Sequence, residues 1–261
     1  MGSKLNTSRI SVTILVKNAQ DTIKECLYAL KSFDEVIILD NKSTDNTLLI
    51  IQELNKDFSN LKVYHSEFIG FGALKNLAIN YARNDWILSI DSDEILQDFV
   101  IDELNKLDLS FQTIVAFGRK NLYRGEWIKA CGWYPDFVYR LFNKKFTKFN
   151  ENIVHESIIL PQNSQKIYIK NALKHYAVQN IESIINKMNF YTSFSATQKY
   201  NVNTKTNIFF AIVRFFLIFF KDYFLRKGFL YGYKGFIIAL LNANGAFFRY
   251  AKLYELNKRE K

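Results

Sequence analysis

Two aspartates stand two residues apart at the end of a hydrophobic segment. Asp91 is the last residue of the apolar segment 86–91, and Asp93 and Glu94 follow it after Ser92. A divalent cation such as Mg²⁺ takes one or two carboxylates from a protein and completes its coordination with phosphate oxygens and water. The spacing therefore suits a site for a metal-bound diphosphate. The alternative is that one carboxylate caps a helix expected near residues 98–106 and that the others are solvated charges.

A third aspartate and a lysine occupy comparable positions earlier in the chain. Asp40 ends the apolar segment 35–40, where a carboxylate can accept hydrogen bonds from a nucleobase or a ribose, or can simply start a turn. Asp45 is expected to cap the next helix. Lys75 follows Gly70-Phe71-Gly72, and its ammonium and the backbone N–H groups of that loop can meet a phosphate. A Gly-x-Gly is also a common plain turn.

Aromatic and charged residues of the second half of the sequence extend this set. Trp133 and Asp136 lie in an aromatic turn before the segment that carries Arg140. An aromatic plane beside a carboxylate suits a sugar ring and an arginine suits a diphosphate, whereas packing in the core is the competing interpretation for Trp133. Glu156 closes a short apolar segment and is either a general base or a surface charge. His175 shows no spacing typical of a metal ligand and is expected to be structural.

An alternation of strands and helices must position these residues. Apolar segments rich in β-branched residues alternate with segments of helical periodicity over the first hundred residues. The predicted strands are 11–17, 35–40, 61–66 and 86–91, and the predicted helices are 21–32, 44–56 and 73–83. This order predicts a mostly parallel sheet covered by helices on both faces. Ligands of such sheets bind at the carboxyl ends of the strands, where Asp40 and Asp91 stand.

The second half of the chain follows a different pattern. Longer strands are predicted at 113–123 and 137–146, and residues 181–256 have a helical pattern throughout. We therefore expect a catalytic domain over residues 1–180 and a helical region over residues 181–261.

The positive charge of the sequence is concentrated in this helical region. The chain has 261 residues and a net charge of +10, and residues 207–261 hold ten Lys/Arg against three Asp/Glu. They also hold 16 of the 42 aromatic residues. The most hydrophobic stretch, residues 208–220, is interrupted by Arg214 and falls short of the roughly 20 residues that a spanning helix needs. These features predict peripheral contact with an anionic membrane surface, unless the helices bury their aromatic residues against the catalytic domain.

Four of these segments resemble a known family. They are ISVTILVKN at residues 10–18, the stretch 40–45, the loop 71–76 and Asp91-Ser92-Asp93, and they resemble the GT-A-fold, family-2 nucleotide-sugar glycosyltransferases. The resemblance implies a Rossmann-like α/β fold and a Mg²⁺ or Mn²⁺ cofactor. It implies that Asp40 holds the uridine, that Lys75 and Asp91 contact the nucleotide-sugar, that Asp93 binds the metal, and that Glu156 is the catalytic base. Lys42 departs from the small residue usual in the family.

The carboxyl half narrows the resemblance. Residues 132–142, 154–157, 223–232 and 250–253 are similar to the lipopolysaccharide or lipooligosaccharide inner-core β-glucosyltransferases, although Tyr231 replaces an acidic residue. The similarity implies transfer of a hexose from a UDP-hexose, UDP-glucose, to a lipid-linked oligosaccharide acceptor. The enzyme would be cytoplasmic, on the inner face of the cytoplasmic membrane, which agrees with an amino terminus that has no apolar signal region. One base without a nucleophilic partner favours the inverting route.

Three alternatives remain at this point. The first is a glycosyltransferase of the same fold that acts on another cell-surface glycan. The second is a metal-dependent phosphohydrolase, although such enzymes usually carry their D-x-D motif after the first strand rather than the fourth. The third is a non-catalytic binder of membranes or nucleic acids. No nucleic-acid partner is expected, because the acidic cluster at Asp40, Asp91 and Asp93 would repel a phosphate backbone.

Overall fold

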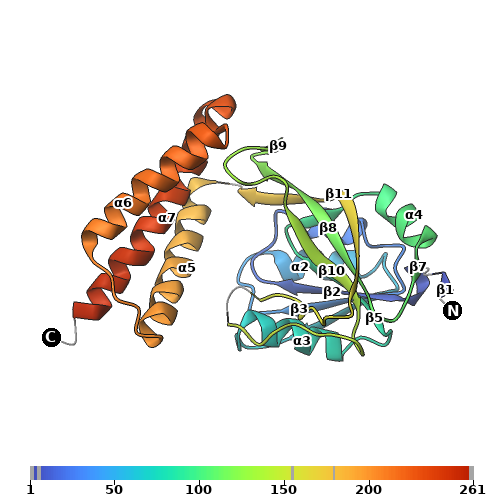
Figure 1. The fold of residues 1–261 in the computed structure, drawn as a ribbon. Coiled ribbons are helices and arrows are strands. Elements are labelled where there is room, and N and C mark those ends of the chain that lie inside the picture. Colours follow the sequence, from blue (N-terminus) through green and yellow to red (C-terminus); the bar gives the residue numbers. More distant parts are fainter. Residues whose placement is uncertain (1–2, 5–6, 154–155, 179, 259–261) are drawn as a thin grey trace. The chain divides into compact units, whose positions relative to one another are not determined.

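The structure, a computed structural model, describes residues 3–4, 7–153, 156–178 and 180–258 (Figure 1). The chain divides into two compact units. The first comprises Met1–Lys120 and Asp136–Tyr176, and the second comprises Asn121–Pro135 and Ala177–Lys261. The segment 121–135 therefore belongs to the same unit as the carboxyl-terminal helices, although it lies between two parts of the first unit in the sequence.

Nine strands of the described residues form one mixed sheet. They are β2 (Ile10–Val16), β3 (Glu35–Asp40), β4 (Leu61–His65), β5 (Trp86–Asp91), β6 (Glu94–Leu96), β8 (Thr113–Tyr123), β9 (Glu126–Trp127), β10 (Phe137–Asn143) and β11 (Gln165–Val178). The order is β4-β3-β2-β5-β10-β8-β11-β6, and β9 pairs with β8. Strands β2 to β5 pair in parallel, whereas β10 runs antiparallel to both β5 and β8, and β11 runs antiparallel to β6. Two short strands, β1 (Ser3–Lys4) and β7 (Asp108–Leu109), pair separately.

The helices of the first unit follow the predicted order. They are the short 3₁₀ turn η1 (Thr7–Arg9), α1 (Ile23–Tyr28), α2 (Thr47–Leu54), α3 (Phe71–Asn80) and α4 (Phe99–Lys106). The strands and helices predicted for the first hundred residues are present, and they follow one another in the predicted order. The predicted fold class, a mostly parallel α/β sheet with helical flanks and a helical carboxyl-terminal extension, is confirmed.

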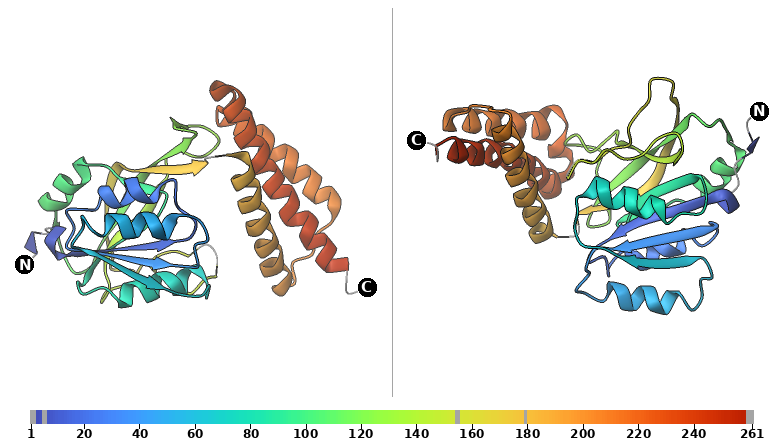
Figure 2. Two further views of the ribbon diagram at one scale, coloured as in Figure 1. Left: turned by 180° about the vertical axis from the view of Figure 1, so that it is seen from behind. Right: turned by 90° about the horizontal axis from the view of Figure 1, so that it is seen from below.

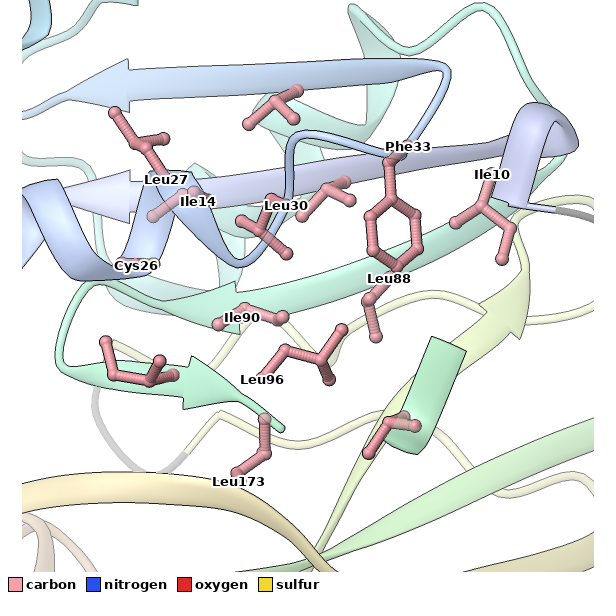
Figure 3. Packing of buried hydrophobic residues seen from close by; sticks show 14 of the residues in the cluster. Ile10, Ile14, Cys26, Leu27, Leu30, Phe33, Leu88, Ile90, Leu96 and Leu173 are labelled. Carbon is pink, nitrogen blue, oxygen red and sulfur yellow. The ribbon is translucent and has the colours of Figure 1, made fainter. Parts of the chain in front are cut away.

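Both faces of the parallel strands are buried. Val36 and Ile38 of β3 belong to the hydrophobic cluster that includes residues of α1, α2 and α4, whereas Ile37 and Leu39 belong to clusters that include residues of α3. Figure 2 shows these helices on opposite sides of the sheet, and Figure 3 shows Leu27 of α1 beside the side chains of β2 in the first cluster. Because neighbouring residues of β3 point to opposite buried faces, its stretch from Val36 to Leu39 is apolar throughout, as is typical of parallel sheets.

Three helices dominate the second unit. They are α5 (Ile181–Asn201), α6 (Ile208–Phe220) and α7 (Gly232–Lys258), and the connection between α6 and α7 contains the π-helical turn η2 (Lys221–Leu225) and the 3₁₀ turn η3 (Gly228–Tyr231). Helix α7 packs against both α5 and α6 (Figure 1). Among the described residues, no helix combines the length and the apolar character that crossing a bilayer requires.

The segment 121–135 packs against the turns and the last helix of its unit. Tyr123 and Ile128 share a hydrophobic cluster with Ile238 of α7. The backbone N–H of Cys131 donates to the carbonyl oxygen of Arg226 at 3.0 Å. The turn η3 itself lies so close to α7 that a Cβ on Gly235 would come within 1.8 Å of a backbone oxygen. This unit therefore has its own core, to which the inserted segment contributes.

A buried glutamate joins the amino-terminal ends of the parallel strands. The carboxylate of Glu35 accepts hydrogen bonds from Ser11 Oγ at 2.7 Å, Lys62 Nζ at 2.6 Å and the backbone N–H of Arg83 at 2.9 Å. Burial alone would raise the pKa of Glu35, but these hydrogen bonds and the charge of Lys62 outweigh it and lower the pKa. The partners lie in β2, in β4 and just before β5, so Glu35 fixes the register of these strands against β3 at that edge.

We expect Glu35→Ala to lower the free energy of unfolding by about 3 kcal/mol, because buried donors lose their acceptor. Urea denaturation at neutral pH measures the change, and the exposed Glu53→Ala serves as the control, with an effect of less than about 0.5 kcal/mol. A depressed pKa in the folded state gives stability that is complete above the pKa of the unfolded chain and is lost as pH falls through the folded pKa. The difference between wild type and Glu35→Ala should therefore shrink in acid; a constant difference would contradict the assignment.

Candidate active site

Asp91 is the centre of a charged cluster at the carboxyl end of β5. Lys75 Nζ from α3 donates to Asp91 Oδ1 at 2.7 Å, and Arg140 Nη2 from β10 donates to Asp91 Oδ2. Lys75 Nζ also lies 3.4 Å from Oε1 of Glu156. Lys75 and Arg140 are both buried. Four residues that the sequence singled out therefore meet at one place.

The cluster continues through two residues to which the sequence analysis assigned no role in a site. Arg140 Nη2 also donates to Glu94 Oε1 at 2.6 Å, and Arg119 Nη1 lies 3.2 Å from the same oxygen. Arg119 Nε donates in turn to Asp136 Oδ2 at 2.8 Å. The other oxygen of Glu94 accepts the backbone N–H of Asp91 at 3.2 Å. Positive and negative groups thus alternate from Asp136 to Asp91, which compensates the cost of burying them.

The electrostatics of the cluster fix the charge of Asp91. Burial raises the pKa of Asp91, but Arg140 and Lys75 outweigh burial and hold the pKa well below its usual value. For Arg140, burial lowers the pKa, and the carboxylates of Asp91 and Glu94 more than reverse this effect and raise it. Asp91 therefore stays ionised at neutral pH, so it holds two cations in position and does not act as a proton acceptor.

A β-bulge directs Arg140 into the cluster. Tyr139 pairs with Ala116 and Leu141 with Val115, so Arg140 is the extra residue of β10. Bulges of this kind change the direction of a side chain and are frequent beside active sites. The Nε of Arg140 is buried and has no hydrogen-bond partner among the described residues. A buried donor without a partner is costly, so this atom indicates a place for a further acceptor such as a phosphate oxygen.

Asp93 lies beside a histidine of β11. Oδ2 of Asp93 is 3.5 Å from Nε2 of His175, and the backbone oxygen of Asp93 accepts the N–H of Tyr176 at 2.9 Å. The pairing of β11 with β6 places His175 opposite Glu94. The sequence analysis expected His175 to be structural because it shows no spacing typical of a metal ligand. The pairing of β11 with β6 brings His175 beside Asp93, which the spacing of the two residues in the sequence does not reveal.

The pair formed by Asp93 and His175 fits a divalent cation. Carboxylate oxygens suit Mg²⁺ and Mn²⁺, and imidazole nitrogen is a common second ligand type for transition metals. Neighbouring ligands of an octahedral ion with bonds of about 2.1 Å lie about 3 Å apart, close to the observed 3.5 Å. Within the described residues there is no group of three or more His, Cys, Asp or Glu side chains that forms a complete metal cage. Phosphate oxygens and water are the usual additional ligands of Mg²⁺.

Asp40 ends the strand two places from β5 in the sheet. Its buried carboxylate accepts the backbone N–H of Ser43 at 3.2 Å and lies 3.5 Å from Nδ1 of His65. In the parallel register, Asp40 is opposite Val16 and Asp91 is opposite Leu15, so both aspartates reach the same edge. Strands two places apart are separated by about 10 Å, so the two aspartates stand at the same edge with β2 between their strands.

The loop before α3 has a different role from the predicted one. The backbone N–H groups of Phe71 and Gly72 donate to the carbonyl oxygens of Ile153 and Asn152, at 3.0 and 3.2 Å. The expectation that these N–H groups meet a phosphate is therefore wrong. The loop instead holds the segment that leads to Glu156, while Lys75 itself is in the cluster as expected.

Trp133 belongs to the second unit. Its backbone oxygen accepts Asn121 Nδ2 at 3.0 Å, and its side chain is partly buried against the cluster that contains Ile128. This environment agrees with the packing interpretation. The role of Trp133 in binding a sugar stays a prediction.

Comparison with known proteins identifies the family. The family model described as glycosyl transferase family 2 matches residues 11–177. An uncharacterized glycosyltransferase of Rickettsia typhi is 32% identical over 265 residues, which cover 97% of this chain and 89% of that protein. The chain belongs to glycosyltransferase family 2.

Two further similarities are more distant. The lipopolysaccharide core biosynthesis glycosyltransferase LpsC of Rhizobium meliloti is 23% identical over 252 residues, which cover 94% of this chain and 92% of that protein. The crystal structure of S. aureus TarS 1–349 in complex with UDP superposes with a TM-score of 0.48 at 17% identity, over 97% of this chain and 92% of that chain.

Proposed function

We propose that this glycosyltransferase transfers glucose from UDP-glucose to an inner-core sugar of a lipopolysaccharide or lipooligosaccharide. The anomeric carbon is inverted, and Mg²⁺ or Mn²⁺ assists the reaction. The enzyme works at the inner face of the cytoplasmic membrane, where a lipid-linked acceptor is anchored. The observation that carries the proposal is the position of Lys75 between Asp91 and Glu156. The similarity to LpsC supports the class of acceptor.

The donor is held along the carboxyl ends of the strands. Asp40 accepts hydrogen bonds from the uridine, and Lys75 and Arg140 face the negative charge of the diphosphate. Asp91 keeps these two cations in place, so their side chains need no reorganisation when the donor binds. Asp93 and His175 would hold the metal ion, whose charge would compensate that of the leaving diphosphate.

Glu156 acts as the base for the acceptor. Of the four carboxylates in the cluster, three are each held tightly by an arginine, namely Asp91, Glu94 and Asp136. Glu156 instead makes a looser contact of 3.4 Å with Lys75. Its carboxylate takes the proton of the acceptor hydroxyl while that oxygen bonds to the anomeric carbon. The bond from the anomeric carbon to the diphosphate breaks in the same step, with the developing positive charge on the sugar ring. A single displacement of this kind inverts the configuration.

A panel of nucleotide-sugars tests the proposal. With Mn²⁺ present, we expect the release of nucleoside diphosphate from UDP-glucose to be at least about tenfold faster than from UDP-N-acetylglucosamine or GDP-mannose, because the site must fit both base and sugar. The product with an inner-core acceptor should carry a β-linkage by NMR. A preference for GDP-sugars would remove the role assigned to Asp40. Hydrolysis of simple phosphate esters without sugar transfer would instead support the phosphohydrolase alternative.

A further inference from the structure

The second unit carries an exposed apolar ridge. Phe209, Phe216 and Phe220 of α6 are 71%, 64% and 54% exposed. Their spacing of seven and then four residues places them on one face of the helix. Leu225 of η2 at 68% and Leu230 of η3 at 65% exposure lie in the connection that follows α6. We call these five residues the ridge.

The ridge is not part of the core of its unit. Helix α6 packs against α7, and Ala211 is its one fully buried residue. Helix α5 lies on the other side of α7 (Figure 1). An apolar surface of this extent on a folded chain marks an interaction site, because water contact with so many large side chains is unfavourable.

The charges around the ridge are cationic. Lys205, Lys221 and Lys227 are exposed, whereas the one acidic residue between positions 203 and 236 is Asp222. Asp222 is buried and accepts hydrogen bonds from Arg226 Nη1 at 2.9 Å and from Asn242 Nδ2 at 2.8 Å. A second copy of the chain on this face would bring Lys221 and Lys227 against the same lysines of the first copy, and Glu126, the half-exposed carboxylate near η3, is already paired with Lys234. The charge therefore favours an anionic apolar partner over self-association.

We propose that the ridge inserts into the surface of an anionic lipid bilayer, with Lys221 and Lys227 at the level of the headgroup phosphates. This inference rests on the proposed function in one respect, that the acceptor is lipid-linked. Helix α6 has 13 residues and is about 20 Å long, so it lies in the interface rather than crossing the bilayer. Phenylalanine and leucine side chains enter the acyl boundary, and lysines add attraction to anionic lipids.

Co-sedimentation of the full chain with vesicles, without donor or metal, tests the apolar contribution. On vesicles that contain phosphatidylglycerol, Phe216→Ser should raise the lipid concentration for half-maximal binding by about tenfold. Phe190→Ser on α5, where the side chain is 46% exposed, is the matched control and should bind like wild type. Circular dichroism and a melting curve confirm that both variants fold. Equal binding of wild type and Phe216→Ser would overturn the proposal.

The contribution of the lysines to vesicle binding is tested with the double variant Lys221→Glu/Lys227→Glu. The control is Lys24→Glu, at an exposed lysine of the first unit. The double variant should lose about tenfold or more in binding to anionic vesicles and little to pure phosphatidylcholine, and the loss should diminish as salt is added. A dimer seen by sedimentation velocity that Phe216→Ser abolishes, without vesicle binding by wild type, would assign the ridge to a second copy and overturn the proposal. Hydrolysis of UDP-glucose in solution is measured separately, so failure of the proposed reaction and failure of membrane binding are distinguishable.

Discussion

Glu156→Gln should lower the rate of glycosyl transfer by about a thousandfold and change the affinity for UDP-glucose by less than about threefold. A positioned general base contributes about 10² to 10⁴ in rate, and glutamine keeps the size of the side chain but cannot take the acceptor proton. Lys75 keeps its stronger contact with Asp91 in this variant, so the donor site stays intact. The measurements are kcat with a saturating acceptor and the Kd of UDP-glucose by calorimetry.

Two further amide substitutions make this result specific. Glu151→Gln is the matched control, because Glu151 lies in the same segment but is highly exposed, 3.7 Å from Lys148. Its rate should equal that of wild type. Asp136→Asn tests the competing base, and its carboxylate is already engaged by Arg119. Loss of transfer in Asp136→Asn together with full activity in Glu156→Gln would show that the base has been assigned to the wrong carboxylate.

Asp93→Ala and His175→Ala should each weaken Mn²⁺ binding in the presence of UDP by about a hundredfold and abolish turnover at ordinary metal concentrations. Each variant removes one of the two protein ligands that we assign to the ion, and the diphosphate then loses its charge compensation. Binding is measured by electron paramagnetic resonance of free Mn²⁺, which reports on the site independently of catalysis. Asp57→Ala, which removes an exposed carboxylate after α2, should bind the metal normally.

The two metal variants can give different answers. Unchanged Mn²⁺ affinity in His175→Ala, with loss in Asp93→Ala, would show that the histidine positions the aspartate instead of binding the ion. Unchanged Mn²⁺ affinity in both variants would show that the metal does not bind at this edge of the sheet. Neither variant is expected to unfold, because both side chains are partly exposed.

The parallel half of the fold follows from local pattern. Strands β2, β3 and β5 each contain a short apolar run, and the helices between them have an apolar face. A parallel sheet with right-handed connections accommodates this alternation. Strand β11 could not be found in this way. Ile167 and Ile169 alternate with polar residues as in a strand, but Asn171 has a φ of 55°, and the alternation breaks where Ala172 and Leu173 are both buried. His175 lies beyond this interruption, so the sequence pattern did not indicate that it lies beside Asp93.

The part of the site that lies at the carboxyl ends of the parallel strands could be predicted from the sequence, because those ends meet at one edge of the sheet. Asp91 and Lys75 were selected because they stand near strand ends that must reach the same edge, and Glu156 because it closes a short apolar segment. The structure places both carboxylates in contact with Lys75. The link through Glu94 and Arg119 could not be predicted, because charged residues in a sequence do not reveal which of them are buried together. That pairing depends on the antiparallel strands and on the bulge in β10.

The segment 121–135 packs with the carboxyl-terminal helices, so it cannot complete its folding during synthesis until those helices have left the ribosome. Cys131 Sγ contacts the backbone oxygen of Gly235, 104 residues further along. The parallel strands emerge and can pair while Tyr123 and Ile128 still await their partners on α7. The turn that carries Trp133 is thus completed last, after a long loop has closed. A nascent chain stalled before its final helix would hold paired parallel strands together with a segment 121–135 that still lacks its packing partners on α7.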